Sequence, residues 1–394
     1  MNQRVYLDNN ATTPLDPAVI AAFSEALTLF GNPSSMHSFG REAASLVADA
    51  RNEAAAILGA TPGEIIFTSG GTESNNTVLS SFAPGIPAGD SVILPPPDRS
   101  ELVVSAIEHP AILETAFALR DRYGITVHLA PIDTTGRIDL EALTHLVSEK
   151  TALVSIMLAN NEIGTIQDLA AISAIAHKAG AFVHTDAVQA VGKIPLDVAA
   201  LGVDYLSASA HKIHGPKGIG LLWMRRGVPF APFMHGGHQE YGRRAGTVNA
   251  PAIAAFGTAC RISREQLGPE AARLAGLRDR LRAGIEERIS DTSVNGNREF
   301  CLPNTLNMSF RAAEGESTLL YLDLENIAVS TGSACASGSL EPSHVLLACG
   351  LTAELAHGSI RFSLGRTTTD EDIDYVLEKL PPIMARIRSM STLR

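Results

Sequence analysis

The chain alternates between short apolar segments and amphipathic ones, and this alternation constrains its fold most strongly. The expected strands and helices follow one another as strand 64–68, strand 102–107, helix 110–123, strand 125–130, helix 139–147, strand 151–158, helix 168–179 and strand 181–185. Segment 151–158 is apolar almost throughout, so both of its faces should be covered. We therefore predict an α/β fold in which a mostly parallel sheet lies between helices.

Five polar residues share one topological position in this pattern. Each follows the end of an expected strand, the last of these strands being 203–206: His109, Asn161, Asp186, Gln189 and Lys212. Because the carboxyl ends of parallel strands meet at one edge of a sheet, we expect these side chains to converge there. Each residue alone also has a plainer interpretation; His109, for example, is equally suited to capping a helix or to packing.

Lys212 stands among small residues and glycines in the segment Ser207–Gly220. His211, His214 and Lys217 lie near it in sequence, and positive neighbours together with burial disfavour an ammonium ion. A neutral lysine in a pocket is what imine formation with a carbonyl requires, as in pyridoxal phosphate enzymes. The alternative is a solvated loop lysine.

A strand, a glycine turn and a helix start follow one another at residues 64–76, with Ser69-Gly70-Gly71-Thr72 at the turn. Backbone amides at such a helix start can hold a phosphate. The alternative is a plain capping turn in which Thr72 or Ser69 caps the helix.

Three further features in the second half of the chain suggest chemistry. Residues 235–247 form a glycine-rich basic loop, either solvated or in contact with an anion and reaching a neighbouring subunit. Cys335 lies within a run of small residues, 330–339, which predicts a mobile loop with a reachable thiol. Arg361 is bracketed by apolar residues and needs an anionic partner, either a substrate carboxylate or a structural ion pair.

Composition excludes several classes of protein. The formal net charge is −11 and no long basic run occurs, which argues against nucleic acid or an anionic membrane surface as a partner. No apolar run is long enough to span a membrane, and the N-terminus lacks the apolar core of a signal peptide. The four cysteines have no CxxC spacing, so neither a disulfide framework nor a resident metal site is expected. We predict a cytoplasmic protein, with Cys260, Cys301 and Cys349 as packing residues.

The motifs together resemble the cysteine desulfurases, in particular the NifS type. The resemblance covers nearly the whole chain and rests on residues 6–13, 31–35, 69–74, 160–162, 184–189, 209–212, 243–247, 332–335 and 360–363. It implies a fold-type I pyridoxal phosphate enzyme, usually a homodimer, with a seven-stranded sheet and a smaller α+β C-terminal domain. We expect residues 15–257 to form the large domain. Residues 1–14 and 258–394 should form the small one, with the cysteine loop at about 328–342.

The resemblance also implies a role for each site residue. Lys212 would hold the cofactor covalently and move the Cα proton; Asp186 would pair with the ring nitrogen, Gln189 with the ring hydroxyl, and His109 would stack on the ring. The phosphate would be bound by Gly71, Thr72, Ser209 and His211, and by Thr247 across the dimer. Asn161 and Arg361 would hold the substrate, and Cys335 would be the nucleophile.

The implied reaction converts L-cysteine to L-alanine and leaves a persulfide on Cys335. The persulfide would pass to an iron–sulfur scaffold protein, NifU-like or IscU-like, and the NifS type points to nitrogenase maturation. No resident metal is implied, although Cys335 could be a transient iron–sulfur ligand in a complex with the scaffold. Two features depart from the family pattern: the proline-rich segment 83–100, and Ala336 in place of a hydroxyl residue.

Two other interpretations compete with this one. Another fold-type I enzyme, such as an aminotransferase or a selenocysteine lyase, fits Lys212 and Asp186 equally well, but a transaminase has no use for the thiol of Cys335. A non-catalytic sulfur carrier or iron–sulfur scaffold would use Cys335 without pyridoxal phosphate, although a scaffold normally needs several clustered thiols.

Overall fold

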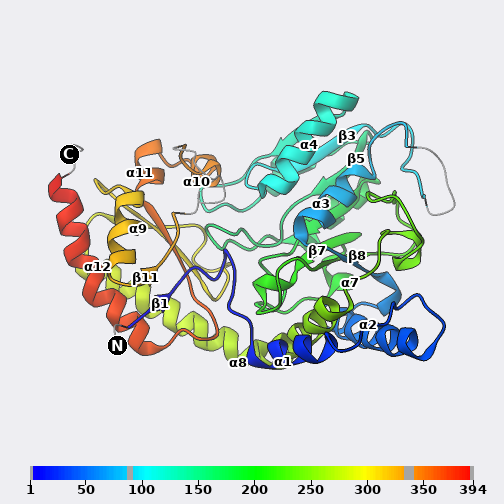
Figure 1. Cartoon of the computed structure of the whole chain (residues 1–394). Helices are drawn as coiled ribbons and strands as arrows, with labels where there is room; N and C mark the ends of the chain where they lie inside the picture. The colour runs from blue at the N-terminus through cyan, green and yellow to red at the C-terminus, as the bar shows by residue number, and fades with distance from the viewer. Residues whose placement is uncertain (1–2, 87–91, 332–340, 391–394) are drawn as a thin grey trace.

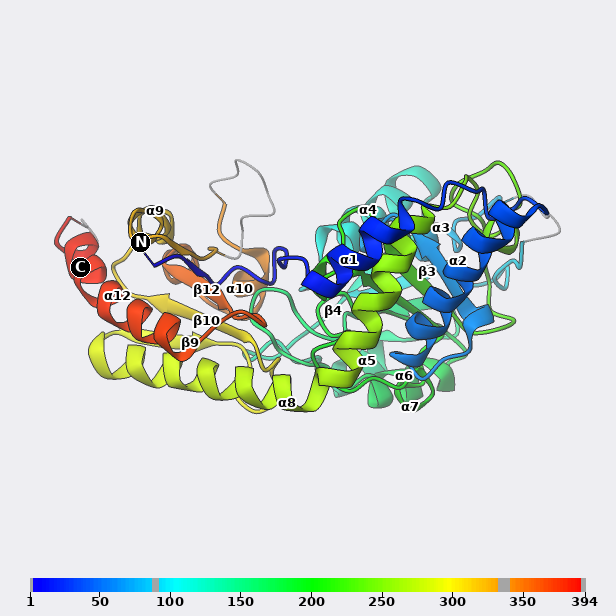
Figure 2. The same ribbon diagram turned by 60° about the horizontal axis from the view of Figure 1, so that its bottom comes forward.

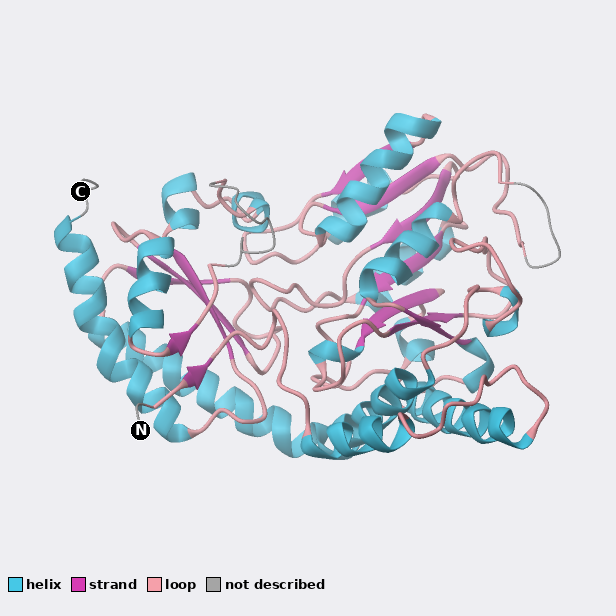
Figure 3. Ribbon diagram, in the orientation of Figure 1, coloured by secondary structure: helices cyan, strands magenta, loops and turns pink. Residues whose placement is uncertain are grey.

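The computed structural model describes residues 3–86, 92–331 and 341–390. These residues form two parts side by side, each with its own sheet and its own hydrophobic core (Figures 1 and 3). We call residues 15–257 the large part and residues 3–14 with 258–390 the small part, a division that remains our proposal. In the predicted cysteine loop, residues 332–340, including Cys335 and Ala336, lie outside the described residues.

The large part contains a seven-stranded sheet. Its strands are β2 (Ile65–Thr68), β3 (Glu101–Ser105), β4 (Thr126–Ala130), β5 (Thr151–Ser155), β6 (Phe182–Asp186), β7 (Tyr205–Ser209) and β8 (Gly220–Met224). Their order is β2-β8-β7-β6-β5-β3-β4. Strand β8 runs antiparallel to both β2 and β7, and the other pairs are parallel, so the predicted mostly parallel sheet is confirmed.

Helices cover both faces of this sheet. They are α1 (Pro17–Ala26), α2 (Ser38–Ala56), α3 (Gly71–Ser80), α4 (Pro110–Tyr123), α5 (Leu140–Leu146), α6 (Leu169–Lys178) and α7 (Val198–Leu201), with 3-10 turns η1 (Pro62–Glu64), η2 (Ala210–Lys212) and η3 (Glu240–Gly242). Neighbouring residues of β5 face opposite layers, since Leu153 packs in the core with α3 and α4 whereas Val154 packs in the core with α2, α5 and α6. Alternate burial on two faces explains why the whole strand is apolar.

The small part is built around a three-stranded antiparallel sheet of order β12-β10-β9. Its elements are β1 (Val5–Tyr6), β9 (Thr292–Asn295), β10 (Thr305–Phe310), α9 (Gly315–Leu324), β11 (Ile327–Ala328), α10 (His344–Ala348), α11 (Ala353–His357), β12 (Ser359–Ser363) and α12 (Asp370–Met390). The first strand, β1, pairs in parallel with β11, and Val5 and Leu7 belong to the core of the small part. These contacts support our assignment of the N-terminal segment to this part.

Helix α8 (Ala250–Arg288) runs through both parts, and Figure 2 shows it changing direction between them. Its side chains up to Ile262 pack in the core of the large part, so this core extends past the boundary that we propose at residue 257, and those from Leu274 onward pack in the core of the small part. Pro269 lies between these two sets, where it removes a backbone donor and favours a bend. Among the described helices, none is both long and apolar enough to cross a membrane.

Candidate active site

The carboxyl ends of β3, β5, β6 and β7 border a cavity of about 180 Å³. Its lining residues are Asn10, Gly71, Thr72, Asn75, His109, Met157, Asn161, Asp186, Val188, Gln189, Ser209, His211, Lys212 and Arg361. All of the predicted site residues except Thr247 and Cys335 are among them. Thr247 is exposed in the described chain, and Cys335 lies outside the described residues.

The start of helix α3 lines the cavity through Gly71 and Thr72. Gly70 is the N-cap, and within the described chain no side chain caps this helix. The alternative of capping by Thr72 or Ser69 is therefore wrong. A Cβ atom on Gly71 would lie 2.6 Å from Val188 Cγ2, so only glycine fits without displacing that side chain. The backbone amides of the first turn therefore remain available to an anion.

Asp186 ends strand β6, and two donors fix its carboxylate. Asn75 Nδ2 donates to Oδ2 at 2.7 Å, and the backbone N–H of Val188 donates to Oδ1 at 2.9 Å. The other atom of the Asn75 amide, Oδ1, is buried without a partner among the described residues. This arrangement holds the carboxylate against the cavity in one orientation.

His109 serves both of the roles that its position suggested. It is the N-cap of α4, where Nδ1 accepts a hydrogen bond from the backbone N–H of Ala111 at 3.1 Å, and it also lines the cavity. Burial lowers the pKa of His109; nearby Asp186 opposes this shift and Lys212 adds to it. A neutral ring whose Nδ1 accepts carries its proton on Nε2.

Lys212 is held at the cavity by the N-terminal segment. Its Nζ donates to the backbone oxygens of Asn10 at 2.5 Å and Ala11 at 2.8 Å. Its neighbour His211 lines the same cavity, and burial, together with Lys212, lowers the pKa of His211 to about 4. The predicted partial neutrality of Lys212 itself stays a prediction.

Arg361 on β12 reaches the cavity from the small part. Nη2 donates to Asp8 Oδ1 at 2.8 Å, and Nη1 donates to the backbone oxygen of Asn161 at 3.0 Å. Nε is buried without a partner among the described residues. Both interpretations of Arg361 therefore stay open, because it makes a structural ion pair with Asp8 and also lines the cavity.

The sequence interpretation missed two polar residues of this site. Asn10 is almost fully buried, and its carbonyl oxygen accepts from both Lys212 and Gln189. Asn75 orients Asp186 from the second turn of α3. Both stand inside motifs that the sequence analysis noted, but their contacts join residues more than a hundred positions apart, which local patterns do not reveal.

The other cysteines lie away from the cavity. Cys260 and Cys349 are buried, which raises the pKa of each thiol, to about 11 for Cys349. Cys301 is only half-buried, and Arg278 Nη1 lies 3.1 Å from its Sγ. Within the described ranges, no cluster of three or more His, Cys, Asp or Glu side chains is placed to hold a metal ion.

Comparison with known proteins assigns the family. Residues 5–376 match the family described as aminotransferase class-V. The chain is 49% identical to a cysteine desulfurase of Gluconacetobacter diazotrophicus over 98% of this chain and 95% of that protein. The chain belongs to the cysteine desulfurases of the class-V aminotransferase family.

Both functional types of this family are represented among its relatives. The chain is 47% identical to cysteine desulfurase IscS of Dictyoglomus turgidum, over 99% of this chain and 97% of that protein. A solved structure titled NifS-like protein matches with a TM-score of 0.89 and 40% identity, covering 98% of this chain and all of that one. Cysteine desulfurases are pyridoxal phosphate enzymes of fold type I, and the seven-stranded sheet of this chain has that architecture.

The cavity fits pyridoxal phosphate. An uncapped helix start suits a phosphate, and the carboxylate of Asp186 suits a protonated ring nitrogen. Lys212 and Gln189 both line the cavity and donate to the same backbone oxygen, that of Asn10. Asn75 and Arg361, which also line it, each have a buried polar atom without a partner among the described residues. Pyridoxal phosphate is an aldehyde, which forms an imine with a lysine amine. Among the residues that line this cavity, the lysine is Lys212.

Proposed function

We propose that this protein takes sulfur from L-cysteine, releases L-alanine, and passes the sulfur as a persulfide on Cys335 to an iron–sulfur scaffold protein. The observation that carries the proposal is that Lys212, Asp186, Arg361 and the open start of α3 border one cavity. An amino acid bound there would have its amine near Lys212 and its carboxylate near Arg361.

The cofactor is held at both ends in this proposal. The first-turn amides of α3, with Thr72, Ser209 and His211, bind the phosphate. Asp186 accepts a hydrogen bond from the ring nitrogen and Gln189 contacts the ring oxygen. When bound, pyridoxal phosphate supplies an electron sink that makes removal of the Cα proton and cleavage of the carbon–sulfur bond feasible.

The substrate is oriented by Arg361 and Asn161. The guanidinium of Arg361 binds the carboxylate, and its ion pair with Asp8 keeps the side chain in place. Lys212 removes the Cα proton and returns a proton later. His109, neutral with its proton on Nε2, packs on the ring and assists these transfers.

Sulfur transfer takes place at Cys335, whose role rests on the sequence. The thiolate of Cys335 attacks the substrate sulfur, a sulfur–sulfur bond forms, and the carbon–sulfur bond breaks with its electron pair going to carbon. Protonation at carbon then yields L-alanine, so L-cysteine and one thiol become L-alanine and one persulfide. No further oxidant or reductant is required.

We further propose that the protein works as a homodimer in the cytoplasm. Thr247, exposed here, would complete the phosphate site of the partner subunit. Large apolar side chains near the N-terminus, among them Phe30 (79% exposed) and Met36 (91%), would be covered by the second copy. A reducing compartment would keep the thiol of Cys335 free.

The acceptor that we propose is NifU-like, which would connect the protein to nitrogenase maturation. The test is to load the enzyme with ³⁵S-cysteine, add either a NifU-like or an IscU-like scaffold, and follow the label. Faster transfer to the NifU-like protein is expected. Equal or faster transfer to the IscU-like protein would remove the nitrogenase link.

The first experiment measures sulfide and alanine released from L-cysteine in the presence of a reductant. Wild type should release both in equal amounts. Cys335→Ala should keep the cofactor absorbance and lose at least a hundredfold in rate, because the nucleophile is gone. Cys301→Ala, which removes a half-buried cysteine outside the cavity, is the matched control and should keep the wild-type rate.

Two results would contradict the proposal. If Cys335→Ala releases sulfide as fast as wild type, Cys335 is not the nucleophile. If Lys212→Ala keeps the bound-cofactor absorbance of wild type, Lys212 does not hold the cofactor.

A further inference from the structure

Lys193 is a second lysine close to the candidate active site. It stands in the turn after β6, four residues beyond Gln189, and is half-buried. Its Nζ donates to Gln189 Oε1 at 2.7 Å and to Asn10 Oδ1 at 3.2 Å. Both acceptors belong to residues that line the 180 Å³ cavity, whereas Lys193 itself does not.

These contacts fix which way the Gln189 amide faces. Gln189 is 4% exposed, so each of its polar atoms needs a partner within the protein. Its Oε1 accepts from Lys193, and its Nε2 donates to the backbone oxygen of Asn10 at 2.8 Å. Since an amide nitrogen carries two N–H groups, one remains for a ligand in the cavity. The amide thus presents a donor, not an acceptor.

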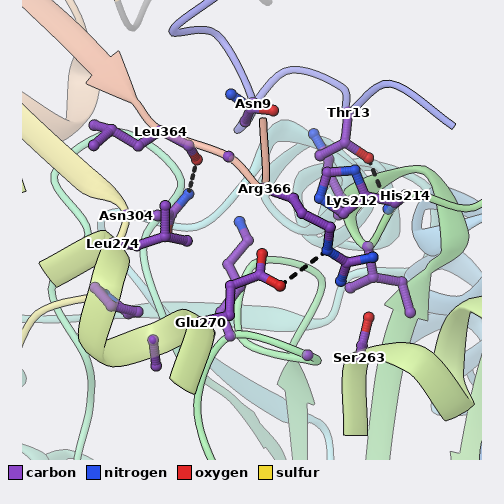
Figure 4. A pocket seen from close by; sticks show the side chains of 16 residues that line it. Asn9, Thr13, Lys212, His214, Ser263, Glu270, Leu274, Asn304, Leu364 and Arg366 are labelled. Carbon is purple, nitrogen blue, oxygen red and sulfur yellow. Dashed lines mark hydrogen bonds and ion pairs between the residues drawn. The ribbon is translucent and has the colours of Figure 1, made fainter. Parts of the chain in front are cut away.

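The surroundings of Lys193 give its amine no carboxylate partner within the described chain. Lys193 lines a second, smaller cavity of about 30 Å³, shown in Figure 4, which Gln189 does not line. The carboxylate there, Glu270, accepts a hydrogen bond from Arg366 at 2.9 Å. Burial lowers the pKa of Lys193 well below its ordinary value, with Lys212 and Arg361 adding to the shift. Burying an amine without a carboxylate partner lowers the stability of the folded protein, and such groups cluster at functional sites.

We propose that Lys193 is a positioning residue that holds the Gln189 amide with its N–H toward the cofactor, so that Gln189 donates to the ring oxygen. The inference rests on the proposed function, because it assumes that the ring oxygen of pyridoxal phosphate lies against Gln189. A donor at that oxygen stabilises its deprotonated form and so lowers the pKa of the bound chromophore.

The test compares the pH titration of the cofactor absorbance in loaded wild type, Lys193→Met and Lys193→Gln. In Lys193→Met the Gln189 amide loses its fixed partner, and the chromophore pKa should rise by about one pH unit. The affinity for pyridoxal phosphate should fall about tenfold, measured by adding the cofactor back to the apoenzyme. Lys193→Gln keeps an N–H donor and should give a smaller shift.

A double variant separates positioning from a direct charge effect. In a Gln189→Leu background there is no amide to position, so adding Lys193→Met should shift the chromophore by less than a third of a pH unit. An equal shift with and without Gln189 would overturn the proposal, as would an unchanged pKa in Lys193→Met. If Lys193→Met does not fold, the same comparison is made with Lys193→Gln.

The titration is repeated in a Cys335→Ala background. Because the chromophore does not need the thiol, failure of the desulfurase proposal leaves this test intact. Conversely, if the enzyme is an active desulfurase but the chromophore pKa is unchanged in Lys193→Met, only the proposed role of Lys193 is wrong. The charged and titratable groups around Lys193, namely Lys212, Arg361, His211, His214, Glu270 and Arg366, are unchanged in every variant.

Discussion

At the scale of single residues, Glu108 is a carboxyl group in an unusual place. It is fully buried beside His109, and Oε1 accepts from Ser105 Oγ at 2.5 Å and from the backbone N–H of Met157 at 2.8 Å. Its Oε2 has no partner among the described residues. Burial, assisted by the negative charge of Asp186, raises the pKa of Glu108 to about 8. The side chain is therefore a neutral acid at pH 7.

This shift predicts a pH-dependent stability. In the unfolded chain Glu108 ionises above about pH 4.5, whereas in the folded protein it stays protonated up to about pH 8, so unfolding releases a proton in this window. Its contribution to stability is complete below about pH 4.5 and is lost as the pH rises through about 8. Relative to Glu108→Gln, which never ionises, wild type should lose up to about 1.4 kcal/mol of unfolding free energy per pH unit.

Urea denaturation from pH 5 to pH 9 measures this difference, with the exposed Glu42→Gln as the matched control that should track wild type. A constant gap between wild type and Glu108→Gln at every pH would show that Glu108 is ionised in the folded protein.

Residue positions were predictable from sequence wherever topology alone decides them. His109, Asn161, Asp186, Gln189 and Lys212 meet because parallel strands end at one edge of the sheet. The partners of these residues were not predictable. Whether Lys193 reaches Asn10 or Asp8 reaches Arg361 depends on how separate segments pack, and a sequence read along the chain has no signal for that.

At the scale of elements, local chemistry fixed the starts of helices better than the ends of strands. The helices expected from residues 139 and 168 begin within one residue of those positions, where Asp139 and Asp168 cap α5 and α6. The strand expected at 151–158 is shorter, since β5 ends at Ser155. Beyond it the chain stays buried but no longer pairs with two strands: the N–H groups of Ile156 and Leu158 donate to β6, whereas that of Met157 donates to Glu108 Oε1. Residues 156–158 are apolar because they are buried, and their apolar character made the expected strand longer than β5.

The start of α3 allows a direct test of an element. Gly71→Ala places a Cβ 2.6 Å from Val188 Cγ2, so we expect a loss of about 1–3 kcal/mol in stability and weaker binding of pyridoxal phosphate. Adding Val188→Ala removes the clash and should restore most of the lost stability and most of the affinity for pyridoxal phosphate. Thermal denaturation and cofactor titration measure the two effects.

The matched control is Gly276→Ala in α8, where nothing lies within 4 Å of the new Cβ. It should stabilise the protein by about 0.5–1 kcal/mol, because alanine is the better helix former. If Val188→Ala does not relieve Gly71→Ala, close packing at this turn is not what requires glycine.

At the scale of the whole molecule, the site depends on how the two parts are held together. Arg366, just after β12, pairs with Asp16 at the start of α1 at 2.7 Å and with Glu270 of α8 at 2.9 Å. Figure 4 shows its guanidinium between elements of both parts, near Lys212 and His214. Arg361 belongs to the small part and reaches the cavity only when the two parts keep this arrangement. The ion pairs of Arg366 therefore stabilise the geometry of the site indirectly.

Arg366→Gln should loosen the small part from the large part, because Asp16 and Glu270 then lose their shared cation. Trp223 is the single tryptophan and is buried in the core of the large part, so its fluorescence follows that part, whereas far-ultraviolet circular dichroism follows both. In urea, the two signals should coincide for wild type and separate in Arg366→Gln, with the dichroism midpoint moving lower by an amount equivalent to about 1–3 kcal/mol.

Arg298→Gln removes an exposed ion pair with Glu286 inside the small part and should shift neither signal by more than about 1 kcal/mol. Coincident transitions in Arg366→Gln would mean that the other contacts between the parts, such as the hydrogen bond from Ser343 to Glu162, are enough to keep them one cooperative unit.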